Sequence, residues 1–189
     1  MTIRTLLLLT VFLIPSIATA QSLEVFGATG AVRLLDDEGS LGLGAPFVGG
    51  VGFRSPHGWG IEALAEAQRA DRRFSSGVRF DSTVTAARAR LLKYFRQGRT
   101  RPYAGGGLGV TRIRSTYDFP SGCGLGPNNQ FACTGRDINR RTSTAGTFSG
   151  FTGVRIAAGG RLFIRPELEI SRAGEHTRLG GTVAVGAAW

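Results

Sequence analysis

The chain has 189 residues, of which 29 are glycine, 42% are hydrophobic and 19% are charged, and its formal net charge is +10. The apolar fraction is too high for a disordered chain and the glycine content too high for a helical bundle. The glycines keep no three-residue period, which excludes collagen, and the length suits one domain. Lys93 is the only lysine, so the positive charge is almost entirely arginine.

The N-terminus has the pattern of an export signal. Arg4 is followed by an apolar run at residues 6–14 and by Ala18-Thr19-Ala20 before Gln21. A positive start, a short apolar core and small residues two apart are typical of a secretory signal peptide, and a membrane anchor would need about 20 apolar residues. We therefore predict a cleavable signal peptide at residues 1–20 and a mature domain at residues 21–189. The mature charge is then +9, because Arg4 is the only ionisable side chain removed.

Apolar residues alternate with small or polar ones along most of the mature chain, which predicts β-strands. In chain order, the predicted strands lie near residues 23–32, 47–54, 59–68, 87–95, 103–110, 148–156, 162–171 and 182–189. Between them, tight connections are predicted at residues 55–58, 97–101 and 158–160, and longer ones at residues 34–44, 69–81, 115–141 and 173–181. Short turns alternating with long loops indicate an outer-membrane barrel.

Aromatic side chains cluster near the predicted short turns. The set comprises Phe53, Trp59, Phe95, Tyr103 and Trp189. Outer-membrane barrels carry aromatic girdles at the membrane interfaces, so we predict that these rings lie on the outer surface.

The only two cysteines, Cys123 and Cys133, are ten residues apart in a stretch rich in Gly, Pro and Asn. A zinc site would need more ligands than this pair, and neither histidine is near in sequence. Disulfides form in the oxidising periplasm. We therefore predict one disulfide within the third long loop, and no metal site.

The mature chain resembles the small eight-stranded OmpA/OmpX-like outer-membrane barrels. The resemblance is carried by RPYAGGGLGV at residues 101–110, by FIRPEL at residues 163–168, and by an alternating last strand that ends in an aromatic residue. It implies an all-β, eight-stranded antiparallel up-and-down transmembrane barrel in the outer membrane, preceded by the signal peptide. It also implies that the barrel-assembly machinery recognises Val183, Val185 and Trp189 during biogenesis, although Phe is commoner than Trp at that terminus.

The alternation also places charged side chains in the barrel lumen. The predicted set is Glu24, Glu62, Glu66, Glu167 and Glu169 with Arg54, Arg88, Arg90, Arg155 and Arg165. The lumen of an eight-stranded barrel is just wide enough for side chains to fill, and unpaired buried charges are costly. We therefore predict a formally neutral, paired network that plugs the lumen.

Glu167 and Glu169 lie on one strand face, and two such carboxylates could also act in acid–base catalysis. We favour the interpretation that both are counter-ions for lumen arginines. The glycines at residues 105–109 lack the Lys-Ser/Thr of a phosphate-binding loop, so no cofactor is predicted. A lipid A-modifying barrel enzyme is the alternative function, but His57 and His176 do not fall beside a serine in the pattern of the deacylases. A lipocalin-type binding barrel would show the inverse pattern, with an apolar lumen.

Basic residues are concentrated in two predicted loops, as Arg72, Arg73 and Arg79 in the second and Arg136, Arg140 and Arg141 in the third. Such arginines are either simply solvated or contact lipopolysaccharide phosphates through their guanidinium groups. We predict a non-enzymatic, monomeric outer-membrane barrel with a structural or surface-interaction role. Its predicted partners are outer-membrane lipid and lipopolysaccharide, with no nucleic acid.

Overall fold

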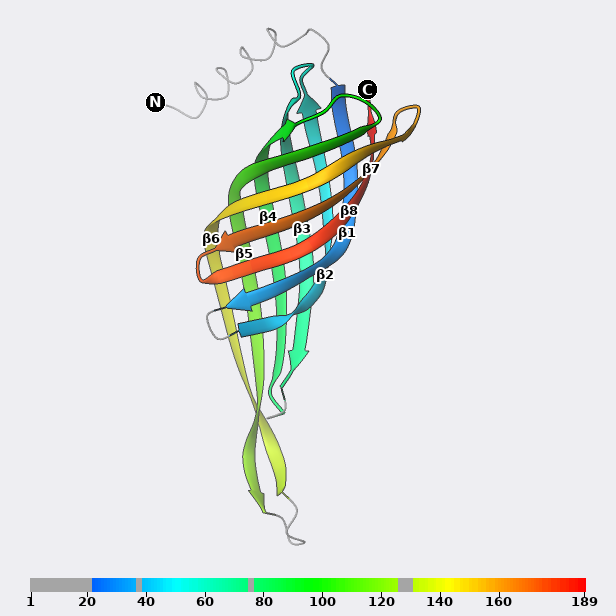
Figure 1. Cartoon of the computed structure of the whole chain (residues 1–189). Helices are drawn as coiled ribbons and strands as arrows, with labels where there is room; N and C mark the ends of the chain where they lie inside the picture. Colours follow the sequence, from blue (N-terminus) through cyan, green and yellow to red (C-terminus); the bar gives the residue numbers. More distant parts are fainter. Residues whose placement is uncertain (1–21, 37–38, 75–76, 126–130) are drawn as a thin grey trace, which may run out of the picture.

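A computed structural model describes residues 22–36, 39–74, 77–125 and 131–189, and in these ranges the chain forms one closed antiparallel barrel (Figure 1). The strands are β1 (Ser22–Asp36), β2 (Gly39–Arg54), β3 (Trp59–Arg73), β4 (Arg79–Tyr94), β5 (Thr100–Leu125), β6 (Phe131–Gly159), β7 (Leu162–Ala173) and β8 (His176–Ala188). Each strand pairs with its sequence neighbours, and β1 pairs with β8 to close the ring. The predicted eight-stranded up-and-down barrel is confirmed. The predicted signal peptide, residues 1–20, lies outside the described residues.

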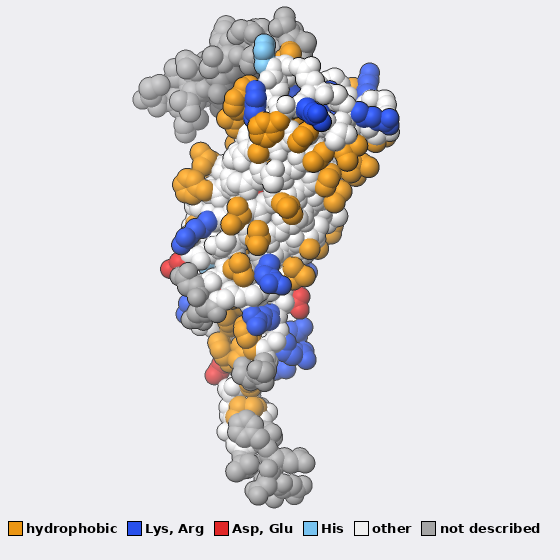
Figure 2. Space-filling model, viewed as in Figure 1, with side chains coloured by type: hydrophobic (Ala, Val, Ile, Leu, Met, Phe, Trp, Pro, Cys, Tyr) orange, Lys and Arg blue, Asp and Glu red, His pale blue; other side chains and the backbone are white. Residues whose placement is uncertain are grey.

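The strands form because their side chains alternate between an apolar outer face and an inner face that is filled. Along β3 every second residue is buried, while Trp59, Ile61, Ala63 and Ala65 are exposed. Figure 2 shows hydrophobic side chains over the wall of the barrel and basic side chains toward its two ends. An apolar outer band between polar ends is the surface that a lipid bilayer requires of a barrel. The described residues contain no helix long and apolar enough to cross a membrane.

Both ends of the described barrel chain, Ser22 and Trp189, lie at the same end of the barrel, where Leu23 and Trp189 exchange backbone hydrogen bonds. The turns after β2, β4 and β6 lie at this end too, and the β5–β6 hairpin projects from the opposite end (Figure 1). Outer-membrane barrels have short periplasmic turns and longer extracellular connections. We therefore assign the end with the termini to the periplasm and the projecting hairpin to the cell exterior.

The predicted long loops are mostly strand. β1 and β2 continue through most of residues 34–44, and β7 is joined to β8 by a turn at Gly174 and Glu175, so the predicted loops at residues 34–44 and 173–181 are wrong. Gly174 has a φ of +59°, which an L-residue rarely adopts and which allows this tight turn. Most of the predicted 69–81 connection is likewise strand, leaving only residues 74–78 between β3 and β4. Backbone pairing continues in these segments because their polar side chains do not interrupt a ladder.

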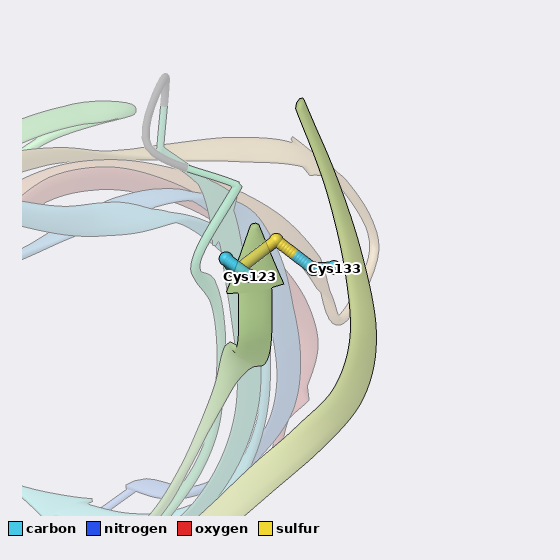
Figure 3. The surroundings of a disulfide bond; sticks show 2 residues. All are labelled: Cys123 and Cys133. Atoms are coloured by element: carbon cyan, nitrogen blue, oxygen red, sulfur yellow. A yellow bond between two sulfur atoms is a disulfide. The ribbon is translucent and has the colours of Figure 1, made fainter. Parts of the chain in front are cut away.

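The third connection is a two-stranded extension of the barrel wall. β5 and β6 stay paired from Thr100 to Leu125, whereas β4 accompanies β5 only as far as Asp118. Cys123 and Cys133 are cross-strand neighbours in the projecting part and form a disulfide (Figure 3). The disulfide therefore cross-links the hairpin outside the ring of eight strands.

Replacing both cysteines by serine is expected to leave the barrel folded. A disulfide stabilises mainly by limiting the freedom of the loop that it closes, and here that loop belongs to the hairpin. The double variant should keep the gel mobility shift between unheated and heated protein, while limited proteolysis should cut the hairpin several-fold faster than in wild type. Loss of the shifted band would show instead that the barrel itself depends on the disulfide.

Candidate functional site: a charged lumen and an outer arginine patch

Glu62 and Arg165 form the centre of the lumen, both almost fully buried. Arg165 donates two hydrogen bonds to the Glu62 carboxylate, the longer one from Nη2 to Oε2 at 3.3 Å. Arg90 lies 3.9 Å from the same carboxylate. β3, β4 and β7 alternate with a period of two, and this alternation points all three side chains inward.

Glu167 joins this cluster from β7. Arg90 Nη2 donates to Glu167 Oε2 at 2.6 Å, and the Tyr103 hydroxyl donates to the same oxygen at 2.7 Å. Tyr103 is therefore fully buried in the lumen, and the prediction that it belongs to an outer aromatic girdle is wrong. Its outward neighbours in β5 are Pro102 and Ala104, so the inward face of the strand determines the place of the ring. Phe53, Trp59, Phe95 and Trp189 are exposed.

Glu66 bridges two arginines in the next layer of the lumen. Arg88 and Arg178 each donate to it, Arg178 through a contact of 3.3 Å and a shorter one, and Arg88 also pairs with Glu169. Arg178 further donates to Gln68 Oε1 at 2.9 Å. Arg178 was missed because residues 173–181 were predicted to be a loop. The alternation of β8, in which Arg178 and Ala184 are both buried, is the signal that could have found it.

The charged network therefore contains one base more than predicted. The predicted five acids and five bases all lie on the inner face, and Arg178 adds a sixth base. At the periplasmic side Glu24 lies 3.1 Å from both Arg54 and Arg155. Every strand except β5 contributes at least one of these charged side chains, and β5 contributes the Tyr103 hydroxyl.

Aromatic rings pack against the guanidinium groups of this network. Arg90 lies 3.4 Å from the Phe151 ring centroid and Arg165 4.2 Å from that of Phe26. Such contacts stabilise a cation where water is scarce. Glycines of the wall make room for these groups, because a Cβ at Gly107 would lie 2.9 Å from Arg90 Cγ and one at Gly105 would lie 2.6 Å from Phe151 Cζ.

An apolar cluster caps the network on the extracellular side. It consists of Leu34, Leu41, Phe80, Val84 and Ile113, all buried. A void among the lumen charges measures about 30 Å³, which is room for about one or two water molecules. The interior can therefore hold the strands together and exclude solvent.

The histidines lie far apart in the described part of the chain, and the paired carboxylates have arginine partners. His57 lies in the periplasmic β2–β3 turn and His176 at the extracellular start of β8, so the two cannot contribute to one site. No group of three or more His, Cys, Asp or Glu residues in the described ranges could hold a metal ion. Glu167 and Glu169 each pair with an arginine, Arg90 and Arg88 respectively.

A patch of exposed arginines lies on the outer wall just above the apolar band, and we call it the arginine patch. Arg69, Arg112 and Arg114 all point outward, from β3 and β5. Thr83 lies between Arg69 and Arg114 in the strand register, so their Cα atoms are about 10 Å apart. The next outward row toward the periplasm is Ala65, Ala87, Val110 and Gly146. The arginine patch therefore borders an uncharged part of the outer wall on its periplasmic side.

The six arginines predicted to bind lipopolysaccharide lie on β3, β4 and β6 toward the extracellular end, where Arg73 and Arg79 are cross-strand neighbours. Arg72 donates to Ser40 O and lies over the Phe74 ring, while Arg136 pairs with Asp118 at 3.0 Å. Arg141 lines the open mouth of the barrel. The remaining three, Arg73, Arg79 and Arg140, are exposed. All six lie in strands and not in loops.

The residues predicted to guide barrel assembly share one face. Val183, Val185 and Trp189 are all exposed on the outer side of the last strand and the residue that follows it. β8 is also the strand whose pairing with β1 closes the barrel.

The solved structures that are similar to this one include outer-membrane barrels. No protein-family model and no curated protein sequence matches the chain. Neisserial surface protein A (NspA) is 14% identical, with a TM-score of 0.63 over 90% of this chain and 100% of that one. A major outer membrane protein of Thermus thermophilus is 7% identical, with a TM-score of 0.63 over 90% of this chain and 100% of that one. Ail of Yersinia pestis, solved in complex with the heparin analogue sucrose octasulfate, is 13% identical, with a TM-score of 0.58 over 89% of this chain and 98% of that one.

Proposed function

The protein is an eight-stranded barrel of the outer-membrane type. We propose that it is a non-enzymatic surface protein whose arginine patch binds phosphate groups of lipopolysaccharide. The arginine patch carries this proposal. Arg69, Arg112 and Arg114 converge from two strands, and the guanidinium group suits phosphate because it offers paired, charge-assisted hydrogen bonds. The complex of Ail with a sulfated sugar lends support, since sulfate and phosphate have similar charge and shape.

The outer wall around the arginine patch supports the same ligand. Thr85, Thr142 and Thr144 lie beside the arginines in the strand register and are exposed, so their hydroxyls are further donors for phosphate or sugar oxygens. The exposed Arg140 lies beyond them, at the level of a saccharide core. The barrel would thus fix lipopolysaccharide molecules around itself while its lumen stays closed.

Biogenesis forms the second part of the proposal. The leader at residues 1–20 would export the chain to the periplasm, and the barrel-assembly machinery would then recognise Val183, Val185 and Trp189. The outward orientation of all three side chains supports this role, because they remain accessible until lipid covers them. We expect the assembled protein to act as a monomer.

Replacing Arg112 and Arg114 together by glutamine is expected to weaken binding of lipopolysaccharide at least about tenfold, because a hydrogen bond to a charged group contributes about 1.5–3 kcal/mol. Binding would be measured with purified lipid A and with dephosphorylated lipid A, and the wild type should prefer the phosphorylated form. A matched control is the exposed periplasmic pair Arg99 and Arg161, whose change to glutamine removes equal charge. Equal loss in the two double variants would refute a specific site.

A further inference from the structure

A groove of about 860 Å³ crosses the outer wall on β3, β4, β5 and β6, on the periplasmic half of the barrel. Its sides are the exposed apolar residues Ile61, Leu91, Leu108 and Phe148. Its floor is Gly106, which is paired with Leu91 on one side and with Gly150 on the other. All of these residues face away from the lumen, so the groove opens toward the bilayer.

The packing of the wall does not require a glycine at the floor of this groove. A Cβ at Gly106 would come no closer than 3.4 Å to any neighbouring atom and one at Gly150 no closer than 4.0 Å, which are ordinary contacts. The inward-facing Gly105 differs, because a Cβ there would lie 2.2 Å from Leu91 O. Missing side chains at Gly106 and Gly150 therefore leave outer space that the barrel itself does not use.

The chain's only lysine stands at the periplasmic end of the groove. Lys93 Nζ donates to His57 O at 3.0 Å and lies 4.7 Å from the Trp59 ring. An ammonium group carries three donors, and among the described residues no carboxylate forms an ion pair with Lys93. Arg96 and Arg99, both exposed, lie in the turn that follows β4. The periplasmic end of the groove therefore has basic side chains at its rim, while the rest of the groove is lined by apolar side chains.

The length of the groove corresponds to one leaflet. From Lys93 to Ala89 the rise along β4 is about 13 Å, or about 10 Å along the membrane normal after a strand tilt of about 40°. The apolar band of such barrels is about 25 Å tall, so the groove reaches from the periplasmic interface to roughly the bilayer centre. A cation at the interface with an apolar groove behind it matches a lipid that has an anionic headgroup and an acyl chain.

We propose that this groove binds one anionic glycerophospholipid of the inner leaflet, with an acyl chain along Gly106 and the phosphate on Lys93. The contact is favourable because the chain fills space between Ile61, Leu91, Leu108 and Phe148 while the phosphate neutralises an interfacial cation. A second outer groove, of about 510 Å³ at Gly27 and Gly49, has no basic residue in its lining and serves as an internal comparison. The proposed lipid site is independent of the arginine patch, which lies at the opposite end of the barrel.

The test is native mass spectrometry of the detergent-solubilised, folded protein with added phosphatidylglycerol or phosphatidylethanolamine. The wild type should retain one phosphatidylglycerol at least about fivefold more strongly than phosphatidylethanolamine. Gly106→Leu should abolish the preference by filling the groove, Lys93→Gln should abolish it by removing the charge, and Lys93→Arg should keep it. Should Gly106→Leu fail to fold, Ala104→Leu fills the same groove from the next outward position of β5.

Gly49→Leu is the matched control, because it fills the second groove and its Cβ meets nothing within 4 Å. It should bind phosphatidylglycerol as the wild type does. The proposal would be overturned by equal retention of the two lipids in the wild type, by full binding in Gly106→Leu, or by equal losses in Gly49→Leu and Gly106→Leu. Lipid A binding by the same variants should stay unchanged. This measurement distinguishes a failure of the phospholipid proposal from a failure of the proposal that the arginine patch binds lipopolysaccharide.

Discussion

Glu66→Gln is expected to lower the free energy of unfolding by about 3–5 kcal/mol, the cost of breaking a buried ion pair. Glu66 is the common acceptor of Arg88 and Arg178, and the amide keeps its size while removing the charge that both arginines share. Arg88 retains Glu169, but Arg178 loses its carboxylate partner and keeps only uncharged acceptors such as Gln68. Urea-induced unfolding of the protein in lipid vesicles would measure the change.

The same variant tests whether the lumen is sealed. The wild type should show no steady current in planar bilayers, because side chains fill the lumen, and Glu66→Gln should add brief small openings. Glu175→Gln, at the exposed β7–β8 turn, is the control that removes a carboxylate from outside the lumen network. It should change neither the free energy of unfolding nor the current. A large, stable current in the wild type would mean that the protein is a channel.

Val185→Arg is expected to cost about 2–4 kcal/mol, the penalty for an arginine on the lipid face near the bilayer midplane. Val185 is 58% exposed on the outer face of β8, four residues before the chain end at the interface. Equilibrium unfolding in bilayers of different thickness would measure the penalty, which should grow with thickness because the guanidinium group must reach further to water.

Two other arginine substitutions serve as controls for depth and for face. Leu162→Arg, on the outer face at the periplasmic start of β7, should cost about 0–1 kcal/mol because it lies near the interface. Ala184→Arg enters the lumen, where Ala184 packs against Phe26 and Phe163, so its penalty should come from volume and should not depend on bilayer thickness. Equal thickness dependence at positions 184 and 185 would mean that the register of β8 is wrong.

The strand count and the two faces of the wall could be predicted because they follow from a local pattern. The segment from Trp59 to Gln68 is an example. Odd-numbered and even-numbered residues of a strand point to opposite faces, and in this segment the two sets keep their different character without interruption. The same reasoning predicted that Arg88, Arg90 and Glu167 face inward. Tyr103 faces inward because its parity in β5, and not its aromatic character, determines its face.

The strand ends could not be predicted in the same way. Residues 34–44 and 173–181 are polar or rich in glycine, as loops are, yet they pair with neighbouring strands. Pairing satisfies backbone groups whatever the side chains are, so a partner that is already in place extends a strand beyond its apolar part. Arg178 and the arginine patch were missed for this reason, since they lie in segments where apolar residues no longer alternate regularly with polar ones.

The sequence by itself determined the architecture and, within the predicted strands, the face of most side chains, because both depend on a period-two pattern that each strand carries in its own residues. Only the tertiary structure decided the partners, such as Glu66 with Arg178, 112 residues away in the chain, and the lipid-facing groove over Gly106. Those features depend on the stagger between strands, which sets the residue that lies beside each position around the ring. That stagger is a property of the closed barrel and is absent from any one strand.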